Sequence, residues 1–207
     1  MAIPVYIKAS CVINDNRIAK NGRLVIEIPG TKLEEFLNGA YQSLETKYPK
    51  FYKMDHLSKL GWLAAEFLLK NDFDKSKYAP EDVALVFMNA SASLDADIRY
   101  YDSTKEIASP ALFVYTLPNI VMGEISIKHN FKGENAFFIF EKFDAEFLYG
   151  YVSNLFENNI VQACICGWVE VLEEKYKAVL YLVEKEGDKE DKFDSENLNK
   201  IYQSYNG

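Results

Sequence analysis

Cysteine and histidine are both scarce in this sequence, which limits the chemistry that it can perform. Its 207 residues include only three Cys and two His. Three thiols cannot form an even disulfide framework, so we expect a protein of a reducing compartment. Metal sites usually need several Cys or His ligands close together, and the sequence offers no such cluster. We therefore predict no metal and no bound cofactor.

Long apolar runs and excess positive charge are also absent. No apolar run approaches the roughly 20 residues that a membrane-spanning helix needs. The first residues lack the basic and then apolar layout of a signal peptide, so we expect a cytoplasmic protein without a membrane span. The formal net charge of −8 argues against a broad surface for nucleic-acid phosphates. Four lysines do gather, on what we interpret as a solvated face rather than a docking patch for an acidic partner: Lys47, Lys50, Lys53 and Lys59.

What the sequence does contain is a large apolar fraction, arranged in alternating strand and helix patterns. Hydrophobic residues make up 49% of the chain, which is typical of a globular domain. The apolar patterns predict strands at residues 5–13, 24–28, 83–88, 136–140, 160–169 and 176–183. Helices are predicted from Thr31, with Glu34 completing a capping box, over residues 55–70, from Ser109-Pro110, and over residues 143–158. Helices between apolar strands indicate an α/β domain with a mixed sheet.

The few cysteines and histidines show no reactive arrangement. Cys164 and Cys166 fall in one predicted strand, whose period of two puts both thiols on the same face. We interpret them as buried structural thiols rather than as metal ligands. His56 and His129 have no evident partner in the sequence.

Four segments in the middle of the chain follow one another in a distinctive order. A turn at Gly133-Glu134-Asn135 leads into the apolar strand 136–141, then the helix 143–158, then Gly167-Trp168-Val169-Glu170. In this order they resemble the G-P-[NS] turn, the nucleophile strand, the long helix and the G-G-x-E motif of β-ketoacyl-acyl-carrier-protein synthases. Paired alanines at residues 64–65 and Pro118-Asn119 agree with the same family.

The resemblance covers roughly residues 1–183 and has implications for the fold. It implies a β-ketoacyl synthase N-terminal-like domain, which is half of a thiolase-like α/β fold with a mixed five-stranded sheet and covering helices. Residues 184–207 are rich in charge, and we expect a charged C-terminal extension made of a solvated loop and a short helix or disordered end.

Two departures from the family pattern bear on activity. Counting from Gly133, Lys142 occupies the position of the family's nucleophilic cysteine. The family's C-terminal half supplies the groups that stabilise the thioester oxyanion, and we expect this half to be missing. A thiolate at a helix N-terminus forms a reactive thioester, whereas an acylated lysine is a stable amide. We therefore predict no catalytic residue and interpret Lys142 as a core or surface lysine at a vacated site.

The resemblance also implies an interface between subunits. In the family, the strand before the nucleophile pairs with its two-fold mate, which here implies an interface formed by Phe137, Phe138, Ile139 and Phe140. An interior strand of a monomer fits the composition equally well. We also expect the helix at residues 143–158 to present an apolar face that a missing half would cover, so that the chain self-associates or pairs with another polypeptide.

Three functional interpretations remain open. The first is a non-catalytic ketosynthase-like subunit that acts like a chain-length factor in fatty-acid, polyketide or aryl-polyene type biosynthesis. The second is a 3-oxoacyl-acyl-carrier-protein synthase or acyltransferase that is active only with a separately encoded C-terminal half. The third is a homodimeric acyl-binding scaffold. The expected partner is accordingly an active ketosynthase subunit or a second copy of the chain, with an acyl carrier protein as a further candidate.

Overall fold

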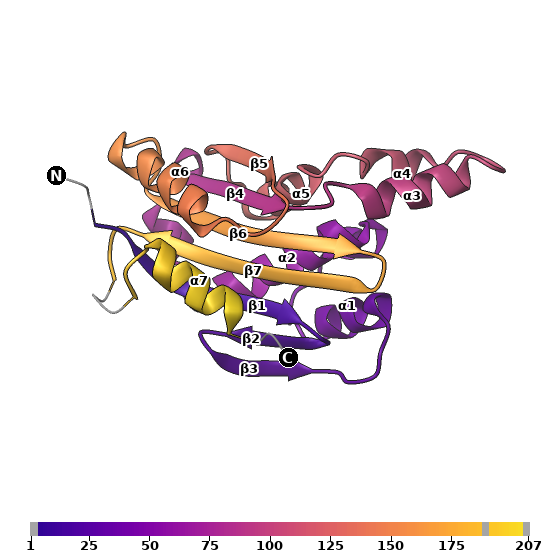
Figure 1. The fold of residues 1–207 in the computed structure, drawn as a ribbon, viewed down its shortest axis with the longest axis horizontal. Helices are drawn as coiled ribbons and strands as arrows, with labels where there is room; N and C mark the ends of the chain where they lie inside the picture. The colour runs from indigo at the N-terminus through magenta and orange to yellow at the C-terminus, as the bar shows by residue number, and fades with distance from the viewer. Residues whose placement is uncertain (1–3, 188–190, 205–207) are drawn as a thin grey trace.

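One mixed sheet organises the molecule. The computed structural model describes residues 4–187 and 191–204, whose ribbon is shown in Figure 1. Their strands form a seven-stranded sheet in the order β3-β2-β1-β7-β6-β4-β5. β4 pairs in parallel with β5 and with β6, and the other neighbours pair antiparallel. The strands are β1 (Tyr6–Asn14), β2 (Arg17–Lys20), β3 (Arg23–Glu27), β4 (Val83–Asn89), β5 (Asn135–Ile139), β6 (Ala163–Leu172) and β7 (Lys175–Glu184).

The sheet has seven strands where the resemblance implies five. Two tight turns fold β1, β2 and β3 into an antiparallel meander that extends the sheet beyond β1. Asp15 and Asn16 in the first turn, and Asn21 and Gly22 in the second, all have positive φ. Two consecutive positive φ values are the signature of the hairpin turns that match strand twist. Six of the seven strands match ranges that the apolar patterns predict, and β2 is the one that was not expected.

Helices cover both faces of the sheet (Figure 1). α1 (Leu33–Gln42), α2 (His56–Leu69) and α5 (Ile120–His129) pack on one face, and α6 (Ala145–Glu157) and α7 (Ser195–Gln203) pack on the other. Short 3₁₀ turns lie at Pro49–Lys53, Lys75–Lys77 and Pro80–Asp82. In the part of the chain that the structure describes, no helix has both the length and the apolar character needed to cross a membrane.

Two further helices, α3 (Leu94–Ser103) and α4 (Pro110–Val114), extend past the end of the sheet (Figure 1). The start of α4 is as predicted, because Ser109 caps it by accepting a hydrogen bond from the Leu112 N–H. α3 was not expected, since residues 89–97 read as a small-residue stretch.

The predicted capping box at the start of α1 is wrong. α1 begins at Leu33, and no side chain caps it. The Thr31 hydroxyl instead donates to the Ile28 carbonyl at 3.0 Å. Glu34 accepts from Lys59 Nζ at 2.6 Å, so its carboxylate is held by α2 rather than by the helix start.

The apolar face of α6 is covered, which corrects the expectation that it lies open. Leu148, Val152 and Phe156 are buried against the sheet, while Glu146 and Asn154 point outward into solvent. The segment after residue 183 contributes to this cover through Phe193 and Leu198, both buried. The Tyr181 hydroxyl ties α7 down by donating to the Leu198 carbonyl at 2.8 Å. Part of the charged C-terminal segment therefore belongs to the core.

One glycine in β6 tests the tight packing of the central strands. Gly167 has a φ of +148°, and an added Cβ would collide with the backbone oxygen of Val179 on β7. We expect Gly167→Ala to lower the free energy of unfolding by at least about 2 kcal/mol, through overpacking and backbone strain. The matched control is Gly150→Ala on the solvent-exposed face of α6, where no heavy atom lies within 4 Å of the added Cβ. This control should raise the free energy of unfolding by about 0.5–1 kcal/mol. Urea unfolding followed by circular dichroism measures both, and equal changes would contradict the β6–β7 geometry.

Candidate functional site

The connection between β5 and α6, residues 140–144, holds the residue that the sequence singled out. The Phe140 N–H donates to the Asn89 carbonyl at 2.9 Å, which fixes the end of β5 on β4. Asp144 caps α6 by accepting from the Phe147 N–H at 2.9 Å. Lys142 lies between these two anchors and is exposed to solvent. Its correspondence to a nucleophilic cysteine stays a prediction.

A loop after β4 lies beside this connection and is held by Glu170 of β6. The Ala90 and Ser91 N–H groups donate to Glu170 Oε2 at 2.6 and 3.2 Å. Asn89 is fully buried and bonds to both the N–H and the carbonyl of Ala92. These contacts hold Ala92 in the left-handed region, with a φ of +49°. The loop's N–H donors that could serve an oxyanion are therefore already engaged by a carboxylate.

Aromatic rings fill the inner side of the connection. Phe143 stacks on Tyr202 of α7, with ring centroids 4.3 Å apart, and meets Trp168 edge-on at 6.3 Å. Lys177 lies over the other ring of this stack, 4.2 Å from the centroid of Tyr202. Burial lowers the pKa of Lys177, and burial followed by the charge of Glu170 raises the pKa of Tyr202. The space behind residues 140–144 is thus packed by the chain's own C-terminal helix.

Both histidines lie on the other side of the sheet from α6, and each contacts a carboxylate. His56 Nδ1 is 3.0 Å from Asp95 and its Nε2 is 3.3 Å from Glu34. His129 Nε2 is 2.5 Å from Glu66. Sequence reasoning missed the Asp95 and Glu66 partners because they are 39 and 63 residues away along the chain. Neither histidine can assist chemistry at Lys142.

The three cysteines are buried and free, as predicted. Cys164 and Cys166 share the α6 side of the sheet, and Cys11 lies on the α2 side. Burial raises the pKa of Cys11 to about 12 and raises that of Cys166 well above its ordinary value. A thiol held neutral in this way is a poor nucleophile. Among the described residues there is also no group of three His, Cys, Asp or Glu that could hold a metal ion.

The strand β5 forms an open edge of the sheet, because only β4 pairs with it among the described residues. Leu85 N–H donates to the Glu134 carbonyl, and Phe140 N–H to Asn89. Alternate residues of a strand turn their backbone groups to opposite sides. The N–H and C=O groups of residues 135, 137 and 139 therefore point away from β4.

Three of the four predicted interface residues, Phe137, Phe138 and Ile139, lie in this edge strand, and Phe140 directly follows it. Phe138 and Phe140 turn toward α6, where both pack against the ring of Phe147 at 4.8 and 4.7 Å. Phe137 turns to the opposite face and is half-buried. The side chain of Ile139 is 50% exposed. The strand is therefore only partly covered by its own chain.

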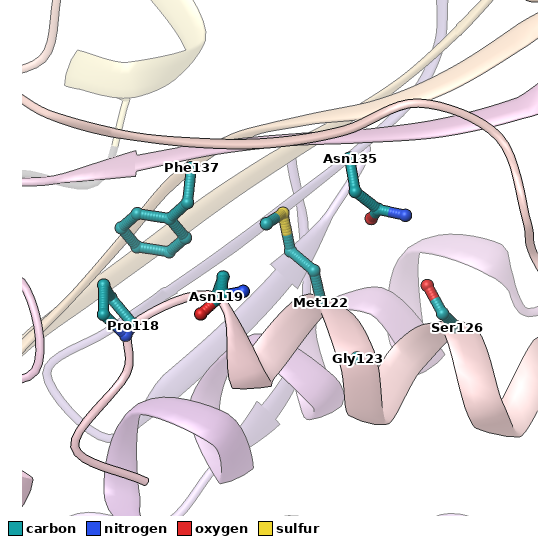
Figure 2. A pocket seen from close by; sticks show the side chains of 7 residues that line it. All are labelled: Pro118, Asn119, Met122, Gly123, Ser126, Asn135 and Phe137. Carbon is teal, nitrogen blue, oxygen red and sulfur yellow. The ribbon is translucent and has the colours of Figure 1, made fainter.

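A groove of about 540 Å³ lies between α5 and β5. Figure 2 shows Met122 of α5 reaching toward β5, with Phe137 and Asn135 on the opposite wall. Its lining residues are Pro118, Asn119, Met122, Gly123, Ser126, Asn135 and Phe137. The groove opens next to the unpaired edge of β5.

No family model and no curated protein matches this chain, but solved structures do. The structure of the ishigamide ketosynthase/chain length factor matches with a TM-score of 0.66 and 16% identity over 87% of this chain. The structure of a type II PKS acyl-carrier protein in complex with its ketosynthase, AntDE:AntF, matches with a TM-score of 0.60 and 14% identity over 89% of this chain.

The chain has the ketosynthase-like thiolase fold. It spans about 62% and 64% of the lengths of these two chains. A third structure, the ketosynthase ApeO in complex with its chain length factor ApeC from Xenorhabdus doucetiae, matches at a TM-score of 0.50. It is 13% identical, and the match covers 77% of this chain and 76% of that one. The expected fold class is thereby confirmed.

Glu170 tests whether the loop after β4 depends on its carboxylate in this ketosynthase-fold chain. We expect Glu170→Ala to lower the free energy of unfolding by about 1 kcal/mol, because two N–H groups lose their acceptor. Glu170→Gln keeps one side-chain oxygen and should cost less. Hydrogen exchange at Ala90 and Ser91 gives the direct measurement. Unchanged protection of both amides in Glu170→Ala would refute the contact.

The lowered pKa of Asp95 makes the stability of the protein depend on pH in the acid range. Burial raises its pKa, but the hydrogen bond and charge of His56, and the Glu173 N–H, outweigh burial and lower it. A lowered folded-state pKa stabilises the protein above the unfolded value of about 3.9, and this stabilisation is lost as pH falls through the folded value. The neighbouring charges are Glu34, Lys59 and Arg99.

We therefore expect Asp95→Asn to lower the free energy of unfolding at pH 7 by about 1–2 kcal/mol. The difference from the native protein should shrink as pH falls below about 4. Asp102→Asn, on the exposed side of the same helix, is the matched control and should have little effect. A difference that stays constant from pH 7 to pH 3, measured by urea unfolding, would show that the charge of Asp95 contributes nothing.

Proposed function

We propose that this chain is a non-catalytic ketosynthase-like subunit, which pairs with an active ketosynthase as a chain-length factor does. Its pathway would be of the fatty-acid, polyketide or aryl-polyene type. It would act in the cytoplasm, where its three buried thiols stay reduced. The observation that carries the proposal is a ketosynthase fold whose β5–α6 connection offers an exposed lysine and no reactive thiol.

Condensation requires an acyl-enzyme that a carbanion can attack. Lys142, if acylated, would form an amide, which is far less reactive than a thioester. A lysine nucleophile also needs a lowered pKa and an adjacent acid or base. Nearby N–H donors are engaged by Glu170, the helix start is capped by Asp144, and both histidines lie across the sheet. The surroundings therefore favour a structural role for this connection.

The alternative of an enzyme completed by a separate C-terminal half receives little support. In the family, two halves pack through shared central helices, so a lone half should leave the α6 side open. Here α6, α7 with Leu198, and Phe193 ahead of α7 cover that side. A second half would have to displace α7 first.

The open edge of β5 and its groove supply a surface for a ketosynthase partner. Outward backbone groups at residues 135, 137 and 139 can add a strand from a second subunit. The groove beside them would then become enclosed between the subunits, lined by Met122 and Phe137. Apolar side chains in such a place would limit the length of an acyl chain that grows in the partner.

Pairing along β5 is tested by co-expression with each ketosynthase encoded beside this gene, followed by size exclusion with light scattering. We expect a one-to-one complex. Ile139→Lys should abolish it, because a lysine on an exposed edge blocks strand addition. The matched control is Val25→Lys, on the opposite open edge, where the side chain is 48% exposed. This control should leave the complex intact.

Incubation with an acylated carrier protein and intact-mass measurement completes the test. We expect no covalent acyl adduct on this chain. An adduct on Lys142 or a cysteine would revive the enzymatic alternative. Absence of a complex with every neighbouring ketosynthase would sink the pairing role, and a stable dimer without a ketosynthase would favour the homodimeric scaffold.

A further inference from the structure

The helices α3 and α4, the residues that join them and the three residues after α4 form a projection. We call this projection, residues 94–117, the apolar arm. Figure 1 shows it extending beyond the strands, away from the two covered faces of the sheet. Of α3, only Asp95 and Ala96 are buried, and no residue of α4 is buried. Tyr115, directly after α4, is also buried, so the arm contributes only Ala96 and Tyr115 to the hydrophobic core.

The arm nevertheless carries more than half of the large exposed apolar side chains reported for the described residues. Seven of its side chains are between 43% and 86% exposed: Leu94, Ile98, Tyr101, Ile107, Phe113, Val114 and Leu117. Scattered apolar residues on a surface are ordinary, but a concentration in one projection marks an interaction site. A five-residue helix such as α4 is also marginal in water without a packing partner.

Polar contacts hold the base of the arm in place. Asp95 binds His56 at 3.0 Å and accepts from the Glu173 N–H at 2.9 Å. The Ser93 hydroxyl donates to the Thr116 carbonyl at 2.9 Å, which joins the two ends of the arm. The arm is thus presented from a fixed base, and a fixed base reduces the entropy lost on binding.

The arm is continuous with the open edge of β5. Its last residue, Leu117, precedes Pro118 and Asn119, which line the groove opposite Phe137 (Figure 2). The end of the arm therefore adjoins the groove beside β5.

We infer that the apolar arm docks on the same ketosynthase-fold subunit that pairs along β5, an inference that rests on the proposed function. The area that a stable interface needs supports docking of the arm on this subunit. A stable interface buries roughly 800 Å² on each partner, and a strand of five residues, about 17 Å long, covers only part of that. The arm supplies adjoining apolar surface on the same side.

Charge distinguishes a ketosynthase from a second copy of this chain. The net charge is −8, and two copies would bring equal acidic surfaces together. Asp97, Asp102 and Glu106 on the arm outnumber Arg99 and Lys105. The partner surface is therefore apolar at its centre with a basic rim, facing the acidic residues of the arm.

Paired variants of the 207-residue chain test the docking. Ile107→Asp with Phe113→Asp should weaken the complex with the neighbouring ketosynthase by at least about tenfold in Kd. Leu24→Asp with Val25→Asp, two exposed apolar residues on the opposite edge, is the matched control and should bind as the native chain does. Thermal unfolding of each variant alone should match the native protein, because the substituted side chains are exposed.

A second measurement identifies the occupant directly. Ile107→Cys labelled with a benzophenone maleimide, and irradiated in the complex, should cross-link to the ketosynthase. If the arm variants bind the ketosynthase as tightly as the unsubstituted chain does, and only Ile139→Lys loses binding, the docking of the arm is refuted. The proposed function is then left intact. Cross-links only to a second copy would also refute the docking of the arm. If the unsubstituted chain forms no complex with any neighbouring ketosynthase, both the docking of the arm and the proposed function are refuted.

Discussion

The parallel pairing of β4 with β5 and with β6 fixes where the other features of this molecule lie. Because the three strands run in one direction, the loop after β4 and the connection after β5 meet beside Glu170 of β6. The same pairing leaves β5 as the last strand, with its outer backbone groups turned outward. One arrangement thus produces both the connection that contains Lys142 and the edge at which another strand can be added.

The chemistry of that connection follows from how its charges are satisfied. The start of a helix favours negative charge, and here the Asp144 carboxylate takes that place by capping the Phe147 N–H. The ammonium of Lys142 stands two residues earlier and in water, where a positive charge costs little. Phe143, between them, is turned inward onto Tyr202. The connection is thereby stable as a structural corner and needs no reactive group.

The sequence foretold the elements whose signals are local. The helix predicted over residues 55–70, the helix start at Ser109 and the apolar runs of β4, β6 and β7 all appear where expected. β2 escaped because four residues are too few to show a period, although Asp15-Asn16 is itself a turn signal. α3 escaped because residues 89–97 read as a small-residue stretch, although Leu94, Ile98 and Tyr101 follow the helical spacing.

Local sequence patterns could not predict the features that depend on contacts with distant residues. The capping box at Thr31 had the right spacing, but Glu34 is drawn away by Lys59 and His56 from another helix. The charged tail read as a solvated loop because its few apolar residues, Phe193 and Leu198 among them, are widely spaced between charges. Only the tertiary structure shows that they seal the sheet.

One side of the molecule is covered by its own chain and another is not, and this difference bears on where a partner can bind. The side where a half of the ketosynthase fold would be expected to lie open is closed by α6 and α7, so the sheet does not depend on a partner there. The side of β5, its groove and the apolar arm remains uncovered, although it carries exposed apolar groups and outward backbone donors. Exposed apolar surface costs free energy in water and is recovered when a complementary surface covers it. Covering the edge of β5 with a partner, as we propose, would recover this free energy.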